Sequence, residues 1–359
     1  MQALKAPKKI LFVKMFSIGD VLNSTPALRA LRERFQESKI IALAGKWSSE
    51  VLHNNPCLNG LIEFDDQILR QKQVKRILQL IAFLRRGHFD AAFILHRSLA
   101  INFLIYLTGI PIRMGINWAG RGYFLTHWVY EDPSSKGHEI ERYLRVLHPW
   151  GIQVKSLNME VYPEESDQQF AKKILAEYKL PGKTLIGICP GGGKNPGENM
   201  PLRRWPIQKY RELVNQLGRR NEYMPILLGG PDDCQYAEEI IRAKPNKFVN
   251  LIGQTTILQA AALMALCDVV VTNDSGLMHL AAAAGAPVIS IFGPTDPLLK
   301  APLGEKHMFL YAHLSCSPCY QSGKFPDCKT QECMQKISVD EVLKAVDQIL
   351  GMRQSKRKC

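Results

Sequence analysis

Residues 9–19 read KILFVKMFSIG, and residues 184–193 read TLIGICPGGG. Each stretch begins with a short apolar run, turns at glycine, and leads into a segment whose apolar residues recur at helical spacing. A continuous apolar strand followed by a turn and a helix is typical of the start of a parallel α/β domain, because both faces of such a sheet are covered. Two such openings in one chain predict two Rossmann-like halves.

Further strands and helices alternate within each half, which predicts the α/β class with mostly parallel sheets. The expected strands are at 39–44, 91–95, 224–228, 249–251, 269–272 and 288–292, and the expected helices are at 73–84, 236–243, 257–266 and 277–284. Pro163, Pro181 and Gly182 interrupt the pattern, which predicts the linker near 162–167 or 180–182. We therefore expect domains at 1–170 and 180–336, followed by a final helix and basic tail at 337–359.

The chain has 359 residues, enough for two domains of ordinary size. Its net charge of +13 divides about evenly between residues 1–165 and 166–359. This distribution suits phosphate-bearing partners or an anionic membrane face, and it argues against a nucleic-acid-binding tail; a solvated basic surface is the alternative. No secretion signal opens the chain, and no apolar stretch reaches the roughly 18 to 20 residues of a spanning helix. We expect a cytoplasmic protein that lies on a membrane without crossing it.

The first candidate group follows the first strand, at 17–20 (SIGD). Gly19 allows a sharp turn, and ligands of open parallel sheets bind at the carboxyl ends of the strands. A carboxylate at Asp20 can accept a proton from an attacking hydroxyl there. Helix capping is the alternative role, because Asp is a favoured N-cap residue. Residues 24–26 (STP) predict a helix cap followed by proline in the first turn.

The second group is a glycine-rich loop at 191–201 (GGGKNPGENMP), followed by RRWP. Its glycines, including Gly191 and Gly192, expose backbone N–H groups, and Lys194, Arg203 and Arg204 add positive charge. This combination can hold a diphosphate. The loop matches neither the Walker A pattern nor GxGxxG, and a flexible surface loop is the alternative interpretation.

The third group is TNDSGLMH at 272–279, directly after a predicted strand. Asp274 can accept hydrogen bonds from sugar hydroxyls. The N–H groups of Ser275 and Gly276, at the start of a helix, can donate to phosphate oxygens. His279 follows about one turn into that helix and faces the same edge. A capped helix with a packed histidine is the alternative for each feature taken singly.

The stretch TNDSGLMHLAAA, followed by APVISIFGPTDP, resembles the signature of glycosyltransferase family 9, the ADP-heptose:lipopolysaccharide heptosyltransferases. The opening KMFSIGDVLNSTPALRAL is similar to the family's first segment, and RRWP, LGGPDD and the C-terminal CxxC also fit. The resemblance covers nearly the whole chain. It implies the GT-B fold, with two Rossmann-like domains facing a central cleft. The first domain would bind the acceptor and the second the nucleotide sugar, with the last helix returning toward the first.

The resemblance also implies roles for single residues. Asp20 matches the family's general base. Arg203 stands where familiar members carry Lys. Arg keeps the positive charge but replaces a single ammonium group with a planar guanidinium that has several N–H donors. Asp233, in LGGPDD, would lie near the adenosine ribose. The nucleotide-sugar site implied by these matches and by the loops comprises Gly191, Gly192, Lys194, Arg203, Asp233, Asp274, Ser275, Gly276 and His279.

The activity that the resemblance implies is inverting transfer of a heptose from ADP-heptose to the inner core of lipopolysaccharide. Fixed cations would stabilise the leaving diphosphate, so that catalysis requires no cofactor. The implied partners are an ADP-heptose-like nucleotide sugar and an anionic glycolipid acceptor, with peripheral contact to the cytoplasmic face of the inner membrane and no nucleic acid.

Three other functions are compatible with parts of the sequence. One is a family 9 transferase with another donor sugar or acceptor, such as a different surface glycan or a protein. A second is an NAD-dependent oxidoreductase, which the missing GxGxxG disfavours. The third is a nucleotide-sugar-binding protein without turnover, which Asp20 disfavours.

Four cysteines lie close together near the C-terminus: Cys316, Cys319, Cys328 and Cys333. The spacing C-x2-C-x8-C-x4-C is compact enough for four thiolates around one structural zinc or iron. In a cytoplasmic protein a metal is favoured over two disulfides, and four reduced, unliganded cysteines are the alternative. We expect no catalytic part for this cluster.

Overall fold

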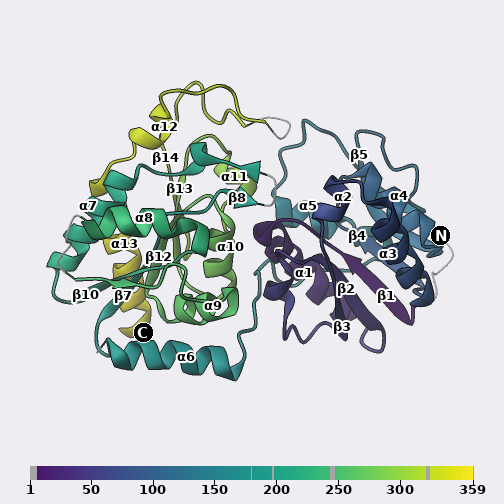
Figure 1. Ribbon diagram of the computed structural model, residues 1–359, viewed down its shortest axis with the longest axis horizontal. Coiled ribbons are helices and arrows are strands. Elements are labelled where there is room, and N and C mark those ends of the chain that lie inside the picture. Colours follow the sequence, from purple (N-terminus) through teal and green to yellow (C-terminus); the bar gives the residue numbers. More distant parts are fainter. Residues whose placement is uncertain (1–5, 179, 196–197, 243–246, 321–323, 359) are drawn as a thin grey trace. The chain divides into compact units, whose positions relative to one another are not determined.

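The computed structural model describes residues 6–178, 180–195, 198–242, 247–320 and 324–358 (Figure 1). Residue contacts divide the chain into two units, Met1–Met159 and Glu160–Cys359, each built around one six-stranded sheet. All neighbouring strands within the two sheets are parallel. The predicted α/β class with two Rossmann-like units is confirmed.

In the first unit the strand order is β3-β2-β1-β4-β5-β6. Its strands are β1 (Lys9–Val13), β2 (Lys39–Gly45), β3 (Gly60–Phe64), β4 (Ala91–Ile94), β5 (Ile112–Trp118) and β6 (His127–Glu131). Its helices are α1 (Ile18–Arg34), α2 (Gln67–Arg70), α3 (Val74–Arg86), α4 (Leu99–Leu107) and α5 (Glu139–Arg145), with short 3₁₀ turns at Ser49–Leu52 and His148–Trp150. The order reverses between β1 and β4, and ligands of such sheets bind beyond the carboxyl ends of the strands at this reversal.

The second unit repeats the same topology in the order β11-β10-β7-β12-β13-β14. Its strands are β7 (Thr184–Cys189), β10 (Tyr223–Leu227), β11 (Val249–Asn250), β12 (Val269–Asn273), β13 (Val288–Phe292) and β14 (Met308–Tyr311); β8 (Lys194–Asn195) and β9 (Glu198–Asn199) form a separate hairpin. Its helices are α6 (Glu165–Glu177), α7 (Ile207–Arg219), α8 (Cys234–Arg242), α9 (Ile257–Leu266), α10 (Gly276–Ala283), α11 (Pro297–Lys300), α12 (Glu332–Gln335) and α13 (Val339–Lys358), with 3₁₀ turns at Pro201–Arg203 and Pro231–Asp233. Here the order reverses between β7 and β12.

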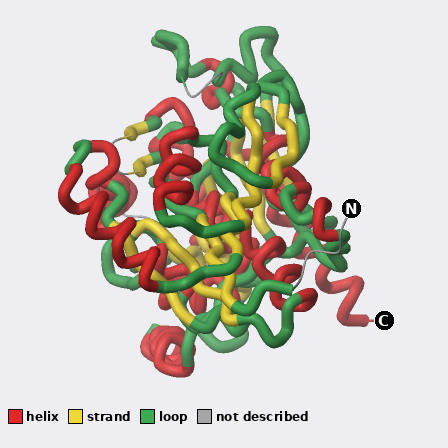
Figure 2. Tube along the Cα trace, turned by 90° about the vertical axis from the view of Figure 1, so that its right-hand side faces the viewer, coloured by secondary structure: helices red, strands yellow, loops and turns green. Residues whose placement is uncertain are grey.

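Helices lie outside the strands, as the red and yellow segments of Figure 2 show. In the first unit, α3 and α4 pack on one face of the sheet, sharing a core with Leu11 and Val13 of β1. Ile10 and Phe12 are equally buried and point to the opposite face, because side chains alternate along a strand. The sheets are therefore buried on both faces, which explains the continuous apolar runs in the sequence.

The expected helix cap at residues 24–26 is wrong, because α1 begins at Ile18 and runs through Pro26. Proline has no N–H to donate to the carbonyl four residues earlier, which is that of Leu22. The hydroxyl of Thr25 donates to this carbonyl instead, at 2.7 Å. The helix therefore continues across the proline without leaving the Leu22 carbonyl unpaired.

The segments around the expected domain boundaries pack on the second unit. The boundary expected at residue 170 falls within α6, which contacts α9. The last helix, α13, contributes Val342, Val346 and Ile349 to the core of the second unit. Its predicted return toward the first domain, and the assignment of acceptor and donor to the two domains, stay predictions. Within the described residues, no helix is long and apolar enough to cross a membrane.

Candidate functional site

Asp20 lies in the first turn of α1, just beyond the carboxyl end of β1. The N-cap position belongs to Ser17, whose Oγ accepts a hydrogen bond from the backbone N–H of Asp20 at 3.2 Å. Ser17 therefore provides the helix cap that was the alternative role for Asp20. The preceding residue, Phe16, has a φ of +85°, which is strained for a residue with a side chain.

His96, which follows β4, holds this strained turn in place. Its Nε2 accepts a hydrogen bond from the backbone N–H of Met15 at 2.8 Å, and its ring meets that of Phe16 edge to face at 5.3 Å. Because Nε2 accepts, the proton of the neutral ring lies on Nδ1. Burial lowers the pKa of His96 well below its ordinary 6.5, the charge of Lys14 lowers it further, and Asp20 opposes both. The sequence analysis missed His96, although it directly follows a predicted strand.

Stability should therefore fall as the pH drops below about 6.5, because the unfolded chain then binds a proton on His96 that the folded protein excludes. Well below this pH, each such proton lowers the free energy of unfolding by about 1.4 kcal/mol per pH unit. We expect His96→Gln, which keeps an acceptor for Met15 but does not titrate, to lose less melting temperature between pH 7.5 and 5.5 than the unmodified protein. Equal losses would contradict this. His307, whose pKa burial lowers to about 4, contributes in the same direction and remains in both proteins.

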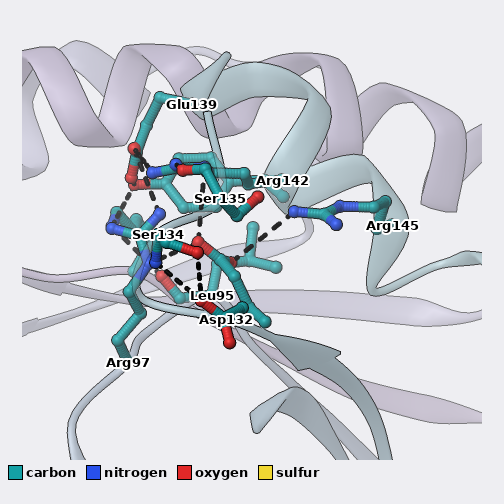
Figure 3. Close-up of polar contacts among 11 residues, drawn as sticks. Leu95, Arg97, Asp132, Ser134, Ser135, Glu139, Arg142 and Arg145 are labelled. Atoms are coloured by element: carbon teal, nitrogen blue, oxygen red, sulfur yellow. Dashed lines mark hydrogen bonds and ion pairs between the residues drawn. The ribbon is translucent and has the colours of Figure 1, made fainter. Parts of the chain in front are cut away.

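A group of buried charges lies beyond the carboxyl ends of β4 and β6 (Figure 3). Arg97 contacts Glu131 and Glu139, both at 3.2 Å, and Arg142 contacts the same two carboxylates at 3.3 and 3.5 Å. Both carboxylates are almost fully buried, whereas Arg97 is 28% exposed. Burial disfavours the charge of Arg97, but the two carboxylates raise its pKa above the ordinary value. Arg97 is thus a permanent cation that reaches the surface of this edge.

Lys14 connects this group to the Asp20 turn. Its Nζ donates to the carbonyl of Leu95 at 3.1 Å and to the hydroxyl of Tyr143 at 2.7 Å, and that hydroxyl donates to Glu139 at 2.7 Å. Burial raises the pKa of Tyr143 well above its ordinary value, and the charge of Asp20 adds to the effect. The charge of Asp20 therefore acts on His96 and Tyr143, within a set of polar side chains from α5 and from the segments that follow β1 and β4. The sequence analysis did not identify most of this set.

In the second unit the glycine-rich loop is held by Asp233. One carboxylate oxygen accepts from the N–H of Gly192 and the other from the N–H of Gly230, both at 3.1 Å. A Cβ at Gly191 would lie 2.0 Å from Asp233, so only glycine fits there. Gly192 has a φ of +89°, and a Cβ there would lie 2.5 Å from the Cβ of Ser275. The loop therefore needs these glycines for close packing. Asp233 accepts hydrogen bonds from the backbone on both sides, and its predicted contact with the ribose stays a prediction.

Lys194 lies in β8, and its side chain is outside the part that the structure describes. The neighbouring Arg204 donates from Nε to the carbonyl of Gly192 at 2.8 Å, which fixes the loop from the other side. Asn273, at the end of β12, donates to the carbonyls of Pro190 and Gly191 at 3.0 Å each. These contacts join the loops after β7 and β12, the two strands at the reversal of the sheet order.

Asp274 and Arg203 meet at this edge. Nη1 of Arg203 lies 3.4 Å from Oδ2 of Asp274, which also accepts from the hydroxyl of Thr295 at 2.7 Å. Burial acts to raise the pKa of Asp274, but Arg203 and Thr295 together hold it below its ordinary value. The guanidinium lies 5.2 Å from the ring centre of Tyr320 and 5.6 Å from that of Phe325. Its Nε is buried and has no hydrogen-bond partner among the described residues, so it can donate to a ligand.

The N-terminus of α10 lies beside this pair. Ser275 is the N-cap of α10, and its side chain makes no capping hydrogen bond. Gly276 begins the helix, and His279 follows, 5% exposed. Lys300, at the end of α11, is near enough to lower the pKa of Asp274. A helix N-terminus with cations around it suits a diphosphate. The structure thus brings the predicted residues of 272–279 together with Arg203 and adds Thr295 and Lys300, which the sequence analysis missed.

The predicted metal site is not supported. Within the described ranges, no group of three or more His, Cys, Asp or Glu side chains is placed to hold a metal ion. Cys316 is exposed, Cys319 and Cys328 are half-buried, and Cys333 is buried, all as free thiols. Burial raises the pKa of Cys319 and Cys333, which favours the protonated thiol over the thiolate that a metal requires.

Comparison with known proteins places these features in context. The family model described as glycosyltransferase family 9 (heptosyltransferase) matches residues 77–329. Lipopolysaccharide heptosyltransferase 2 of Salmonella typhimurium is 29% identical over 309 residues, which cover 83% of this chain and 86% of that protein. The solved structure of E. coli ADP-heptose lps heptosyltransferase II superposes with a TM-score of 0.77 at 25% identity, covering 96% of this chain and 99% of the other. A family 9 glycosyl transferase from Veillonella parvula gives 0.81 at 22% identity, covering 96% and 97%.

Proposed function

Because the chain belongs to glycosyltransferase family 9, the heptosyltransferases, we propose that it transfers a heptose from ADP-heptose to the inner core of lipopolysaccharide. The lipopolysaccharide heptosyltransferase 2 proteins of Salmonella typhimurium and Escherichia coli are both 29% identical to it, which supports this choice of donor and acceptor. The observation that carries the proposal is the ion pair of Arg203 with the buried Asp274 beside the N-terminus of α10.

The second unit binds the nucleotide sugar in this proposal. Asp274 accepts hydrogen bonds from the sugar hydroxyls, and Arg203 donates to the diphosphate through its unpartnered Nε. The backbone N–H groups of Ser275 and Gly276 donate to phosphate oxygens, as helix N-termini do. The remaining donor residues are Gly191, Gly192 and Lys194 in the loop after β7, Asp233 beneath it, and His279 in α10.

Asp20 acts as the general base on the acceptor. Its carboxylate takes the proton of an acceptor hydroxyl, whose oxygen forms a bond to the anomeric carbon while the bond from that carbon to the diphosphate breaks. Attack from the face opposite ADP inverts the anomeric configuration in a single displacement. Negative charge develops on the departing ADP, where Arg203, Lys300 and the α10 N-terminus stabilise it electrostatically. This chemistry requires no cofactor.

The acceptor is an anionic glycolipid, so the enzyme works in peripheral contact with the cytoplasmic face of the inner membrane. Arg97, a partly exposed cation of the buried charge group, is suited to an acceptor phosphate or carboxylate. Glu131 and Glu139 hold its guanidinium in position, which lowers the entropy lost on binding.

A transfer assay with a defined inner-core acceptor tests the proposal. ADP-heptose should give a product heavier than the acceptor by one heptose, with release of ADP. Binding of ADP-heptose without any product would instead identify a sugar-nucleotide-binding protein. Turnover of NAD without a change in acceptor mass would identify an oxidoreductase.

A further inference from the structure

The charge of the first unit is concentrated in one segment. Between residues 67 and 130 the sequence contains nine Lys or Arg residues and one acidic residue, Asp90. Six of the nine lie in or beside α2 and α3, and all six are exposed: Arg70, Lys72, Lys75, Arg76, Arg85 and Arg86. A surface of this kind attracts anionic partners.

Large apolar side chains are exposed between these cations. On α3, Val74, Leu78 and Phe83 are 64%, 56% and 57% exposed. On α4 every exposed residue is apolar or aromatic, and the helix carries no charged residue. Those residues are Leu99, Ala100, Phe103, Tyr106 and Leu107.

These exposed side chains form one surface, which we call the α3–α4 face. The two helices contact each other and pack on the same face of the sheet, so their outer sides point the same way (Figure 1). The rings of Phe103 and Tyr106 cluster with Phe124, at 4.9 and 5.3 Å between ring centres, and Arg113 lies 5.3 Å from the ring of Tyr106. Aromatic rings beside arginines are typical of the interface between water and lipid.

The α3–α4 face adjoins the Asp20 turn at two points. Arg70, at the end of α2, lies 5.9 Å from the ring centre of Phe16, within the strained turn. The helix α4 begins at Leu99, two residues after Arg97. A lipid whose sugars reach the carboxyl edge of this sheet would therefore have its membrane end near α4.

We propose that the α3–α4 face docks on a bilayer that contains anionic lipid, with the aromatic side chains of α4 in the interface and the cations of α3 against the headgroups. The proposal rests on the proposed function in so far as the acceptor is a membrane lipid. Charge complementarity favours lipid over a protein partner, because the face combines basic and apolar side chains with almost no acidic ones. A helix such as α4, with five exposed apolar or aromatic residues and no charged residue, is uncommon on the surface of a protein that contacts only water.

Vesicle flotation tests this docking. The full-length protein should float with vesicles of phosphatidylglycerol and phosphatidylcholine, less so at high salt, and not with phosphatidylcholine alone. Lys75→Glu/Arg76→Glu should weaken binding at least about twenty-fold, because each basic residue near an anionic surface contributes roughly five-fold. Phe103→Ser/Tyr106→Ser should weaken it as well and increase the remaining salt dependence.

The matched control is Lys172→Glu/Lys173→Glu on α6, which changes the same number of exposed charges in the second unit. It should bind within about two-fold of the unmodified protein. The proposal would be overturned if this control lost as much vesicle binding as the α3–α4 variants, or if both α3–α4 variants bound normally. It would also be overturned if vesicle binding were lost only when residues 354–359 are removed. Transfer to a deacylated, water-soluble acceptor should be unchanged in the α3–α4 variants. An unmodified protein that floats but transfers nothing would refute the proposed function and leave the docking surface intact.

Discussion

Replacing Asp20 with Asn should lower kcat roughly 10²- to 10⁴-fold, the contribution typical of a general base, while the affinity for ADP-heptose stays within a few-fold. Asn is the same size as Asp, and the hydrogen bond to Ser17 uses the backbone N–H of residue 20, so the start of α1 is preserved. Only the proton acceptor is lost. Single-turnover kinetics with a saturating donor separates the chemical step from binding.

Asp90→Asn is the matched control for this variant. Asp90 lies in the same unit but at the opposite end of the sheet, where it accepts from the N–H groups of Lys8 and Lys9 at 2.8 Å. Its change to Asn should leave kcat nearly unaffected. If Asp20→Asn turned over at a near-normal rate, Asp20 could not be the base, whatever the control showed.

Arg203→Ala and Asp274→Ala should each weaken donor binding roughly ten- to hundred-fold, because a hydrogen bond to a charged group contributes about 1.5 to 3 kcal/mol. Arg203→Lys should recover part of the affinity, since it restores the positive charge but not the several N–H donors of the planar guanidinium. Isothermal titration with ADP-heptose measures all three. Asp274→Ala should also lower the melting temperature, because it leaves the 13% exposed guanidinium of Arg203 beside two aromatic rings without its carboxylate.

A matched control for Arg203→Ala is Arg220→Ala. Arg220 is also paired with a carboxylate, Asp347, at 2.7 Å, but on the surface of the second unit. Its loss should leave donor affinity unchanged, since a surface ion pair contributes little. Unchanged affinity in both Arg203→Ala and Asp274→Ala would place the donor site elsewhere.

The buried central strands and the edge strand β11 could be predicted from the sequence, whereas β3, β5, β6 and β14, at or next to a sheet edge, could not. Strands such as β12 (VVVTN) and β13 (VISIF) are continuous apolar runs, because helices cover both faces of the sheet there. The missed strand β5 (IRMGINW) contains Arg and Asn, and β6 (HWVYE) lies at the edge with Trp128 and Tyr130 exposed. Polar residues are tolerated at such positions, so the apolar pattern that identifies a strand is lost.

The candidate site was predictable where its residues are contiguous. The group around Asp274 occupies eight successive residues that begin at the end of an apolar strand, and the structure places Arg203 beside Asp274. The surroundings of Asp20 were not predictable, because Lys14, His96 and Tyr143 come from separate segments that meet only through the strand order. Nor does the spacing of the C-terminal cysteines indicate that their loop carries Tyr320 and Phe325 to Arg203.

The mass of the product formed from a mixed pool of donors tests the central claim most directly. The protein would be given ADP-heptose together with UDP-, GDP- and other ADP-sugars, and two lipopolysaccharide acceptors, one without inner-core heptose and one that carries a single inner-core heptose. The account predicts one product, heavier by a single heptose, with ADP released in equal amount and no product from the Asp20→Asn variant. Transfer of a hexose from a UDP- or GDP-sugar would contradict it, and so would the absence of transfer from ADP-heptose by folded protein.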